Sequence, residues 1–132
     1  MHRAMSLNMY LAVAAGGALG SVGRYIFVGQ AARLLGVGFP WGTLGVNVIG
    51  SLLMGLAAGV YAARVSAPPE IQAFISVGVL GGFTTFSAFS LDVVQLYERG
   101  QWALAVVYGA ASFGLSLGAL LIGLTFMRRL LT

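Results

Sequence analysis

Four long stretches without a charged residue constrain this chain more than any other feature. They cover residues 4–23, 34–63, 71–91 and 101–127. A helix needs about 20 apolar residues to cross a bilayer, and each stretch is long enough. With 59% hydrophobic and 8% charged residues among 132, the composition excludes an ordinary soluble domain. The sequence therefore predicts an all-α membrane protein with one four-span domain, residues 1–132, and spans near 7–28, 41–63, 71–97 and 102–126.

The third stretch is interrupted by Gly81-Gly82-Phe83-Thr84-Thr85-Phe86-Ser87-Ala88-Phe89-Ser90. A bilayer offers no water to loosened backbone groups, so such a break persists only inside protein or beside a water-filled cavity. Broken helices of this kind direct free carbonyls and half-helix ends at ions. We therefore predict a third helix broken near its middle, in a protein that handles ions.

The charged residues leave the orientation open. The chain has no lysine and no cysteine, and its arginines form no run suited to nucleic acid. Arg3, Arg64, Arg128 and Arg129 lie on one predicted face, and Arg24, Arg33 and Arg99 on the other. An excess of Lys and Arg marks the cytoplasmic side, so this near balance fits a weakly specified single topology or a dual topology with antiparallel pairing. Four short helices enclose no wide pathway, which favours an oligomer.

Glycines at small-xxx-small spacing indicate close helix packing. The pairs are Gly16/Gly20, Gly55/Gly59, Gly78/Gly82 and Gly114/Gly118. Such spacing lets helix backbones approach closely where lipid supplies no hydrophobic force for association. Together the pairs predict a tightly packed bundle.

Two spans carry polar residues at every fourth position. Thr43, Asn47 and Ser51 recur in the second span, and Tyr108, Ser112 and Ser116 in the fourth. Residues four apart share a helical face, so each span presents a polar stripe. For a single serine or threonine, interhelical hydrogen bonding explains the residue better than function does. Two stripes beside a broken helix favour a polar pathway.

Phe86 and Phe89 lie near one face of the half-helix after the break. Aromatic residues at this spacing usually pack, but the electropositive edge of a phenyl ring can also face an anion. Asp92 is the only acid near the break, and a cation pathway would carry more embedded acid than that. Arg24, at the predicted end of the first span, either snorkels to the interface or forms a positive vestibule that gathers anions.

Three ordered blocks resemble the small bacterial Fluc/CrcB fluoride channels. They are Gly16-Gly17-Ala18-Leu19-Gly20-Ser21-Val22-Gly23-Arg24-Tyr25, Gly42-Thr43-Leu44-Gly45-Val46-Asn47-Val48-Ile49-Gly50, and the interruption at residues 81–90. The resemblance covers nearly the whole chain. It implies a passive fluoride channel of the bacterial inner (cytoplasmic) membrane that exports fluoride from the cytoplasm. It also implies an antiparallel homodimer with two pores, each lined by both subunits.

The resemblance assigns roles to individual residues. Asn47 would donate hydrogen bonds to fluoride, Phe86 and Phe89 would offer ring edges, and Tyr108 and Ser112 would continue a polar track. Thr43, Thr85 and Ser116 match the polar pattern, and Arg24 would attract anions at the vestibule. The backbone carbonyls of Gly81 and Thr84 would hold a central, structural sodium ion. The family pattern leaves the role of Asp92 open.

The sequence also bears on two other functions, an exporter and a membrane scaffold. A small four-span, proton-coupled exporter of cationic compounds relies on a glutamate embedded in the first span, and here that span has no carboxylate. A non-transporting membrane scaffold would explain the glycines but not the polar stripes beside the break. An enzyme is not expected, because the spans contain no acid–base pair and no cluster of metal ligands.

Overall fold

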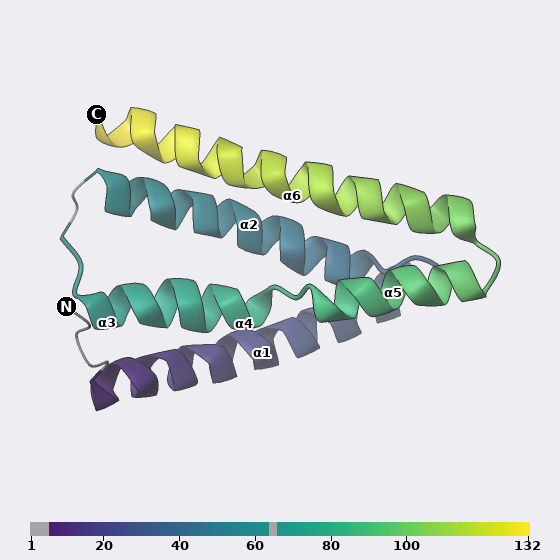
Figure 1. Ribbon diagram of the computed structural model, residues 1–132, viewed down its shortest axis with the longest axis horizontal. Coiled ribbons are helices and arrows are strands. Elements are labelled where there is room, and N and C mark those ends of the chain that lie inside the picture. Colours follow the sequence, from purple (N-terminus) through teal and green to yellow (C-terminus); the bar gives the residue numbers. More distant parts are fainter. Residues whose placement is uncertain (1–5, 64–65) are drawn as a thin grey trace.

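The computed structural model describes residues 6–63 and 66–132, and within these residues every regular element is helical. Helix α1 spans Leu7–Leu35, α2 spans Trp41–Ala62 and α6 spans Trp102–Leu131 (Figure 1). Together with the segment Pro69–Glu98, these are four helices long and apolar enough to cross a membrane. The predicted four-span, all-α architecture is confirmed.

The third span is built from several helical pieces. It begins with α3 (Pro69–Gln72), continues through the π-helical segment η1 (Ala73–Leu80) and α4 (Gly81–Phe83), and resumes as α5 (Ser87–Glu98). Between α4 and α5 the backbone of Thr84 is extended, with φ −87° and ψ 159°. The predicted break is therefore confirmed, while the wide π turns before it were not predicted.

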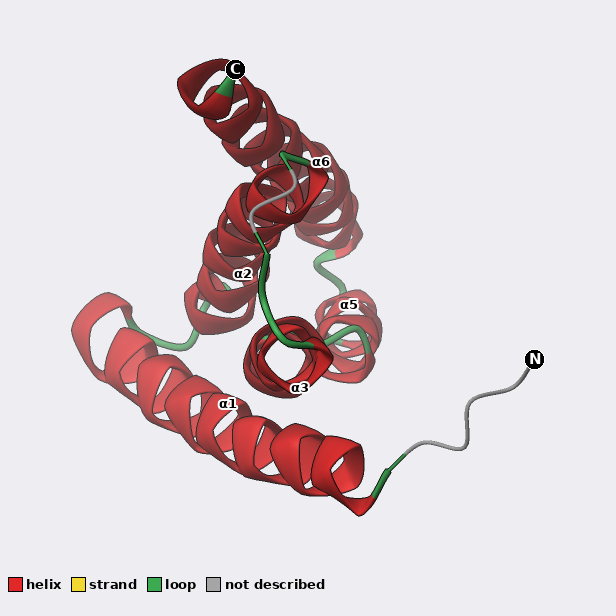
Figure 2. Ribbon diagram, turned by 90° about the vertical axis from the view of Figure 1, so that its left-hand side faces the viewer, coloured by secondary structure: helices red, strands yellow, loops and turns green. Residues whose placement is uncertain are grey.

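The break lets the two halves of the third span contact different helices. The first half packs along α1, whereas α5 contacts α6 and, to a smaller extent, α2. Helices α2 and α6 form the most extensive helix pair (Figures 1 and 2). The two halves of the third span therefore border different helices on either side of the break.

Close backbone contacts occur at three of the four predicted glycine pairs. A Cβ on Gly55 would collide with the carbonyl of Leu120 on α6, and one on Gly78 would lie 2.8 Å from the Cα of Gly16 on α1. Around Gly114 and Gly118, by contrast, no atom of another described helix lies within 4 Å of a built Cβ. Within the described residues of one chain, this last pair therefore makes no close contact with another helix, and its predicted role in packing stays a prediction.

Three of the four observed spans are longer than predicted, most clearly α1, which continues past the expected end near residue 28 to Leu35. The second span, α2, ends at Ala62, close to its predicted end. Arg33 in the last turn of α1 and Arg99 after α5 lie at one end of the bundle, and Arg128 and Arg129 end α6 at the other (Figure 1). Arg3 and Arg64, which entered the predicted charge count, lie outside the described residues.

Candidate ion pathway

Asn47 of α2 clamps the backbone at the break. Its Oδ1 accepts a hydrogen bond from the Thr85 N–H at 2.8 Å, and its Nδ2 donates to the Thr85 carbonyl at 2.9 Å. The side-chain amide thus replaces the two backbone partners that Thr85 would have in a helix. Of the two N–H donors on an asparagine amide, one is committed here and the other is left for a further acceptor.

The break also frees two backbone carbonyls. In an α-helix the Gly81 carbonyl would accept from the N–H of Thr85, but that N–H donates to Asn47. The Thr84 carbonyl would accept from the N–H of Ala88, which instead donates to Thr85 Oγ1 at 3.1 Å. Gly81 and Thr84 both line the cavity described next. Two freed carbonyl oxygens at one point of a span fit the oxygen ligands that a hard cation such as sodium prefers.

A cavity of about 670 Å³ opens between α2, the broken span and α6. It gathers eight of the residues predicted for the fluoride and sodium sites. These are Asn47, Gly81, Thr84, Thr85, Phe86, Phe89, Ser112 and Ser116. Ser51, the third member of the α2 stripe, lines the same cavity, together with Gly109, Phe113 and Leu117. Two residues of each polar stripe therefore face one space beside the break.

The hydroxyls of Ser112 and Ser116 are buried and have no hydrogen-bond partner within the described residues. A buried hydroxyl without a partner costs about 1–3 kcal/mol, so such groups are rare unless they serve a purpose. Hydrogen bonding between helices, the alternative weighed for single serines, does not apply to these two within this chain. Both hydroxyls remain able to donate to a ligand in the cavity.

An aromatic chain leads out of the cavity. The Phe86 ring centroid lies 5.5 Å from that of Phe89, and Phe89 lies 5.1 Å from Tyr108. Tyr108 is fully buried, meets Phe39 edge-on at 5.4 Å, and donates its hydroxyl to Asp92 Oδ2 at 3.0 Å. Tyr108 therefore belongs to this row of aromatic rings and does not line the cavity itself.

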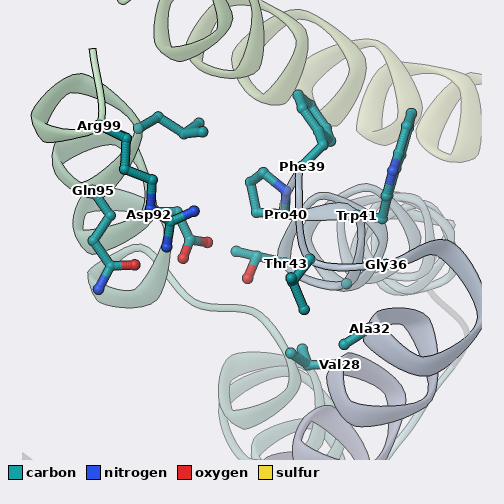
Figure 3. Close-up of a pocket in the computed structure, with 13 residues that line it drawn as sticks. Val28, Ala32, Gly36, Phe39, Pro40, Trp41, Thr43, Asp92, Gln95 and Arg99 are labelled. Carbon is teal, nitrogen blue, oxygen red and sulfur yellow. The ribbon is translucent and has the colours of Figure 1, made fainter. Parts of the chain in front are cut away.

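Two other predicted residues also lie outside the cavity. Thr43 is buried and lines a separate, smaller pocket with Asp92 (Figure 3). Arg24 lies inside α1, and its Nε donates to the Gly82 carbonyl at 3.1 Å. The predicted position of Arg24 at the end of the span is wrong, because α1 continues for several turns beyond it. Its guanidinium instead ties α1 to the break through a charge-assisted hydrogen bond.

The sequence alone did not identify Phe39 or the partner of Asp92. Phe39 belongs to the connector between α1 and α2, and nothing in a short Gly/Pro-containing turn indicates contact with a tyrosine about 70 residues away. Asp92 and Tyr108 belong to different spans, so their hydrogen bond has no signal in local spacing. Ser51 had such a signal, because it continues the stripe of Thr43 and Asn47.

Comparison with known proteins supplies independent evidence. The family described as CrcB-like protein, Camphor Resistance (CrcB), matches residues 11–124. The chain is 52% identical over 124 residues to a protein of Nitrobacter hamburgensis named fluoride-specific ion channel FluC 1, covering 94% of this chain and 98% of the relative. Proteins named fluoride-specific ion channel FluC from Rhodospirillum centenum and Rhizobium etli are 53% and 54% identical, covering 92% and 89% of this chain and 97% and 94% of those proteins.

Proposed function

The chain belongs to the CrcB-like family, and from this premise we propose that it is a fluoride-selective passive channel of the bacterial inner membrane. The observation that carries the proposal is the single cavity in which Asn47, two phenylalanines and the unpartnered Ser112 and Ser116 hydroxyls meet beside the break. Its physiological role is to let fluoride leave the cytoplasm and so to protect the cell from fluoride toxicity.

The groups in the cavity suit a small anion that holds its water tightly. Such an ion must exchange water for equivalent hydrogen bonds at each step. Ser112 and Ser116 offer O–H donors, and Asn47 offers the N–H that Thr85 does not use. The ring edges of Phe86 and Phe89 add weak positive potential without competing acceptors. No carboxylate lines this cavity, so no side chain of like charge repels fluoride there.

A second copy of the chain completes the site in this proposal. The cavity is bordered by Phe86, which is 78% exposed, and by Phe113, which is 73% exposed. Phenyl rings tolerate lipid, but the freed carbonyls of Gly81 and Thr84 on the same wall do not. An antiparallel copy would cover both, and its own cavity would supply a second pore. The near balance of arginines at the two ends fits insertion in both orientations.

Sodium fits the centre of this dimer as a structural ion. The carbonyls of Gly81 and Thr84 from each subunit would hold it, because their helical N–H partners are engaged by Asn47 and Thr85. When bound, the ion would supply positive charge that neutralises converging carbonyl dipoles and joins the two broken helices. Thr84 is fixed for this role, since its N–H and Oγ1 both donate to the Leu80 carbonyl, at 3.1 and 3.0 Å.

A passive pathway is sufficient for fluoride removal. Hydrogen fluoride crosses lipid as a neutral acid and ionises in the more alkaline cytoplasm, where the anion cannot return through hydrocarbon. An inside-negative potential favours anion exit by about 2.3 kcal/mol per 100 mV. The channel therefore needs no nucleotide site and no coupling carboxylate. Its relatives are named as ion channels, which are not enzymes.

Efflux from liposomes tests the proposal. Purified protein is reconstituted in vesicles loaded with potassium fluoride or potassium chloride, and release is started with valinomycin and read with ion-selective electrodes. We expect rapid fluoride release with chloride retained. Absence of fluoride release from folded protein would refute the channel and favour a non-transporting scaffold. Drug-dependent proton uptake would favour the exporter instead.

Sodium binding is tested separately by thermal unfolding in sodium and in N-methyl-D-glucamine buffers, without any transport. We expect a higher midpoint in sodium, because an ion that binds only the folded dimer stabilises it. Equal midpoints across a wide sodium range would refute the sodium site while leaving the channel intact.

A further inference from the structure

A second pocket, of about 240 Å³, lies at the end of the bundle where α1 and α5 finish (Figure 3). Asp92, Gln95 and Arg99 line it from the α5 side, and Thr43 lies opposite them at the start of α2. Residues three and four apart share a helix face, so these three α5 residues form one polar edge. We call this pocket the outer chamber.

The outer chamber and the cavity are lined by successive residues of the same two helices, α2 and α5. On α2, Thr43 lines the chamber, and Asn47 and Ser51, the next members of the same stripe, line the cavity. On α5, Phe89 lines the cavity, and Asp92 one turn later lines the chamber. Tyr108 joins the two spaces, since its ring contacts Phe89 and its hydroxyl donates to Asp92. The two spaces therefore follow one another along the same two helix faces.

The guanidinium of Arg99 carries the positive charge in the chamber and is not engaged by another described residue. Arg99 is exposed, and within residues 6–63 and 66–132 its guanidinium has no hydrogen-bond partner. Arg24, the arginine first assigned to the vestibule, instead donates to Gly82. Arg33 lies at the same end of the bundle but does not line the chamber. Among the arginines of the described residues, Arg99 is thus the one that lines the chamber.

We propose that the outer chamber is the water-facing mouth of the fluoride pathway and that Arg99 concentrates the anion there. The proposal rests on the channel function proposed above. A cleft with low-dielectric walls raises the concentration of a small anion beside a fixed cation. In the chamber that cation is Arg99, which follows the end of α5, about two turns beyond the Asp92 carboxylate that lines the same pocket. Asp92, held by Tyr108, marks the inner limit of the chamber and keeps the anion from binding too tightly. In an antiparallel dimer one such chamber faces each side of the membrane.

Charge removal at two matched arginines tests this proposal. Arg99→Gln is compared with Arg33→Gln and Arg99→Lys in fluoride efflux at low fluoride, in about 10 mM and about 300 mM potassium isethionate. We expect Arg99→Gln to lower the efflux rate about three- to tenfold at low salt. High salt screens a single exposed charge, so the difference should shrink there. Arg33→Gln and Arg99→Lys should remain near the unmodified rate.

The natural chain has no cysteine, which permits a chemical version of the same test. Arg99→Cys is treated with a cationic or an anionic methanethiosulfonate reagent, with Arg33→Cys as the matched control. We expect the cationic adduct at position 99 to restore efflux and the anionic adduct to lower it further, with little change at position 33. Because both adducts form on already folded protein, a folding defect cannot produce opposite effects.

The outcomes separate the two proposals. If the unmodified protein releases no fluoride, the channel function fails and the outer chamber with it. If the unmodified protein conducts but the variants at positions 99 and 33 behave alike, the channel stands and the role of Arg99 is refuted. A loss in Arg99→Gln that is equal at low and high salt, and that the cationic adduct does not repair, also refutes it.

Discussion

The clamp between Asn47 and Thr85 gives the sharpest prediction about stability. Asn47→Ala removes both hydrogen bonds, of 2.8 and 2.9 Å, and leaves the N–H and C=O of Thr85 without their partners. An unsatisfied backbone group at a buried site costs about 1–3 kcal/mol. Water in the cavity can reach both half-buried groups, so the lower limit applies to each, and we expect a loss of about 2–3 kcal/mol. For a protein of this size that corresponds to about 5–10 °C in the unfolding midpoint.

Thermal unfolding of the purified protein in detergent, followed by the fluorescence of Trp41 and Trp102, measures this loss. Ser51→Ala is the matched control, because Ser51 lines the same cavity one turn later on α2 and has no side-chain hydrogen bond within the described residues. Its midpoint should change by less than about 2 °C. Asn47→Asp keeps an acceptor for the Thr85 N–H and should unfold between the two. Equal midpoints for Asn47→Ala and Ser51→Ala would refute the clamp.

Three further predictions concern the pathway and the helix packing. Ser112→Ala should leave the unfolding midpoint unchanged or raise it, because it removes a buried hydroxyl without a partner. The same variant should lower fluoride efflux at least about tenfold. A lower midpoint with normal efflux would contradict this prediction. Phe86→Ile should cut efflux and leave the proposed dimer intact on size-exclusion chromatography. Phe89→Ile should also lower the midpoint, because Phe89 packs on the core through Tyr108. Normal efflux in the folded double variant would remove the role of the ring edges. Gly55→Ala should lower the stability of the α2–α6 pair by about 1–3 kcal/mol in thermal unfolding, because its Cβ meets the Leu120 carbonyl. Gly114→Ala should leave the stability unchanged. Equal losses of stability in the two variants would contradict the packing described for α2 and α6.

The features that could be predicted are those that depend on neighbouring residues: the length of a charge-free stretch, a cluster of residue types, or a regular spacing. Charge-free length fixes a span, because each charged group in hydrocarbon is costly, and the observed spans follow the predicted ones closely. The break at residues 84–86 could be predicted because glycine, threonine and serine cluster where a continuous apolar run would otherwise stand. The stripes of Asn47 and Ser112 could be predicted from spacing alone, and both do line one cavity.

Contacts between distant parts of the chain could not be predicted in the same way. Arg24 reaches the Gly82 carbonyl because α1 packs along the first half of the third span, and no local spacing encodes that register. The Asp92–Tyr108 hydrogen bond depends on how far α5 turns toward α6 after the break. Gly114 and Gly118 have the same spacing as Gly55 and Gly59, yet only the second pair meets another helix of the chain. Spacing identifies a face, but the packing partner of that face depends on the whole fold.

Selectivity by hydrogen bonding requires donors that the protein itself does not satisfy. A sequence lists the donors of Asn47, Thr85, Ser112 and Ser116 but cannot say which are already engaged. Thr85 uses its N–H and C=O on Asn47, and its Oγ1 accepts from the N–H of Ala88. Its hydroxyl also lies 3.3 Å from Ser87 Oγ, within hydrogen-bonding distance, so Thr85 stabilises the break more than it faces an ion. Ser112 and Ser116 have hydroxyls that nothing engages within the described residues, and Asn47 retains one N–H. Fluoride should therefore depend on these three residues more strongly than on Thr85, an order of importance that equal polarity in the sequence would not give.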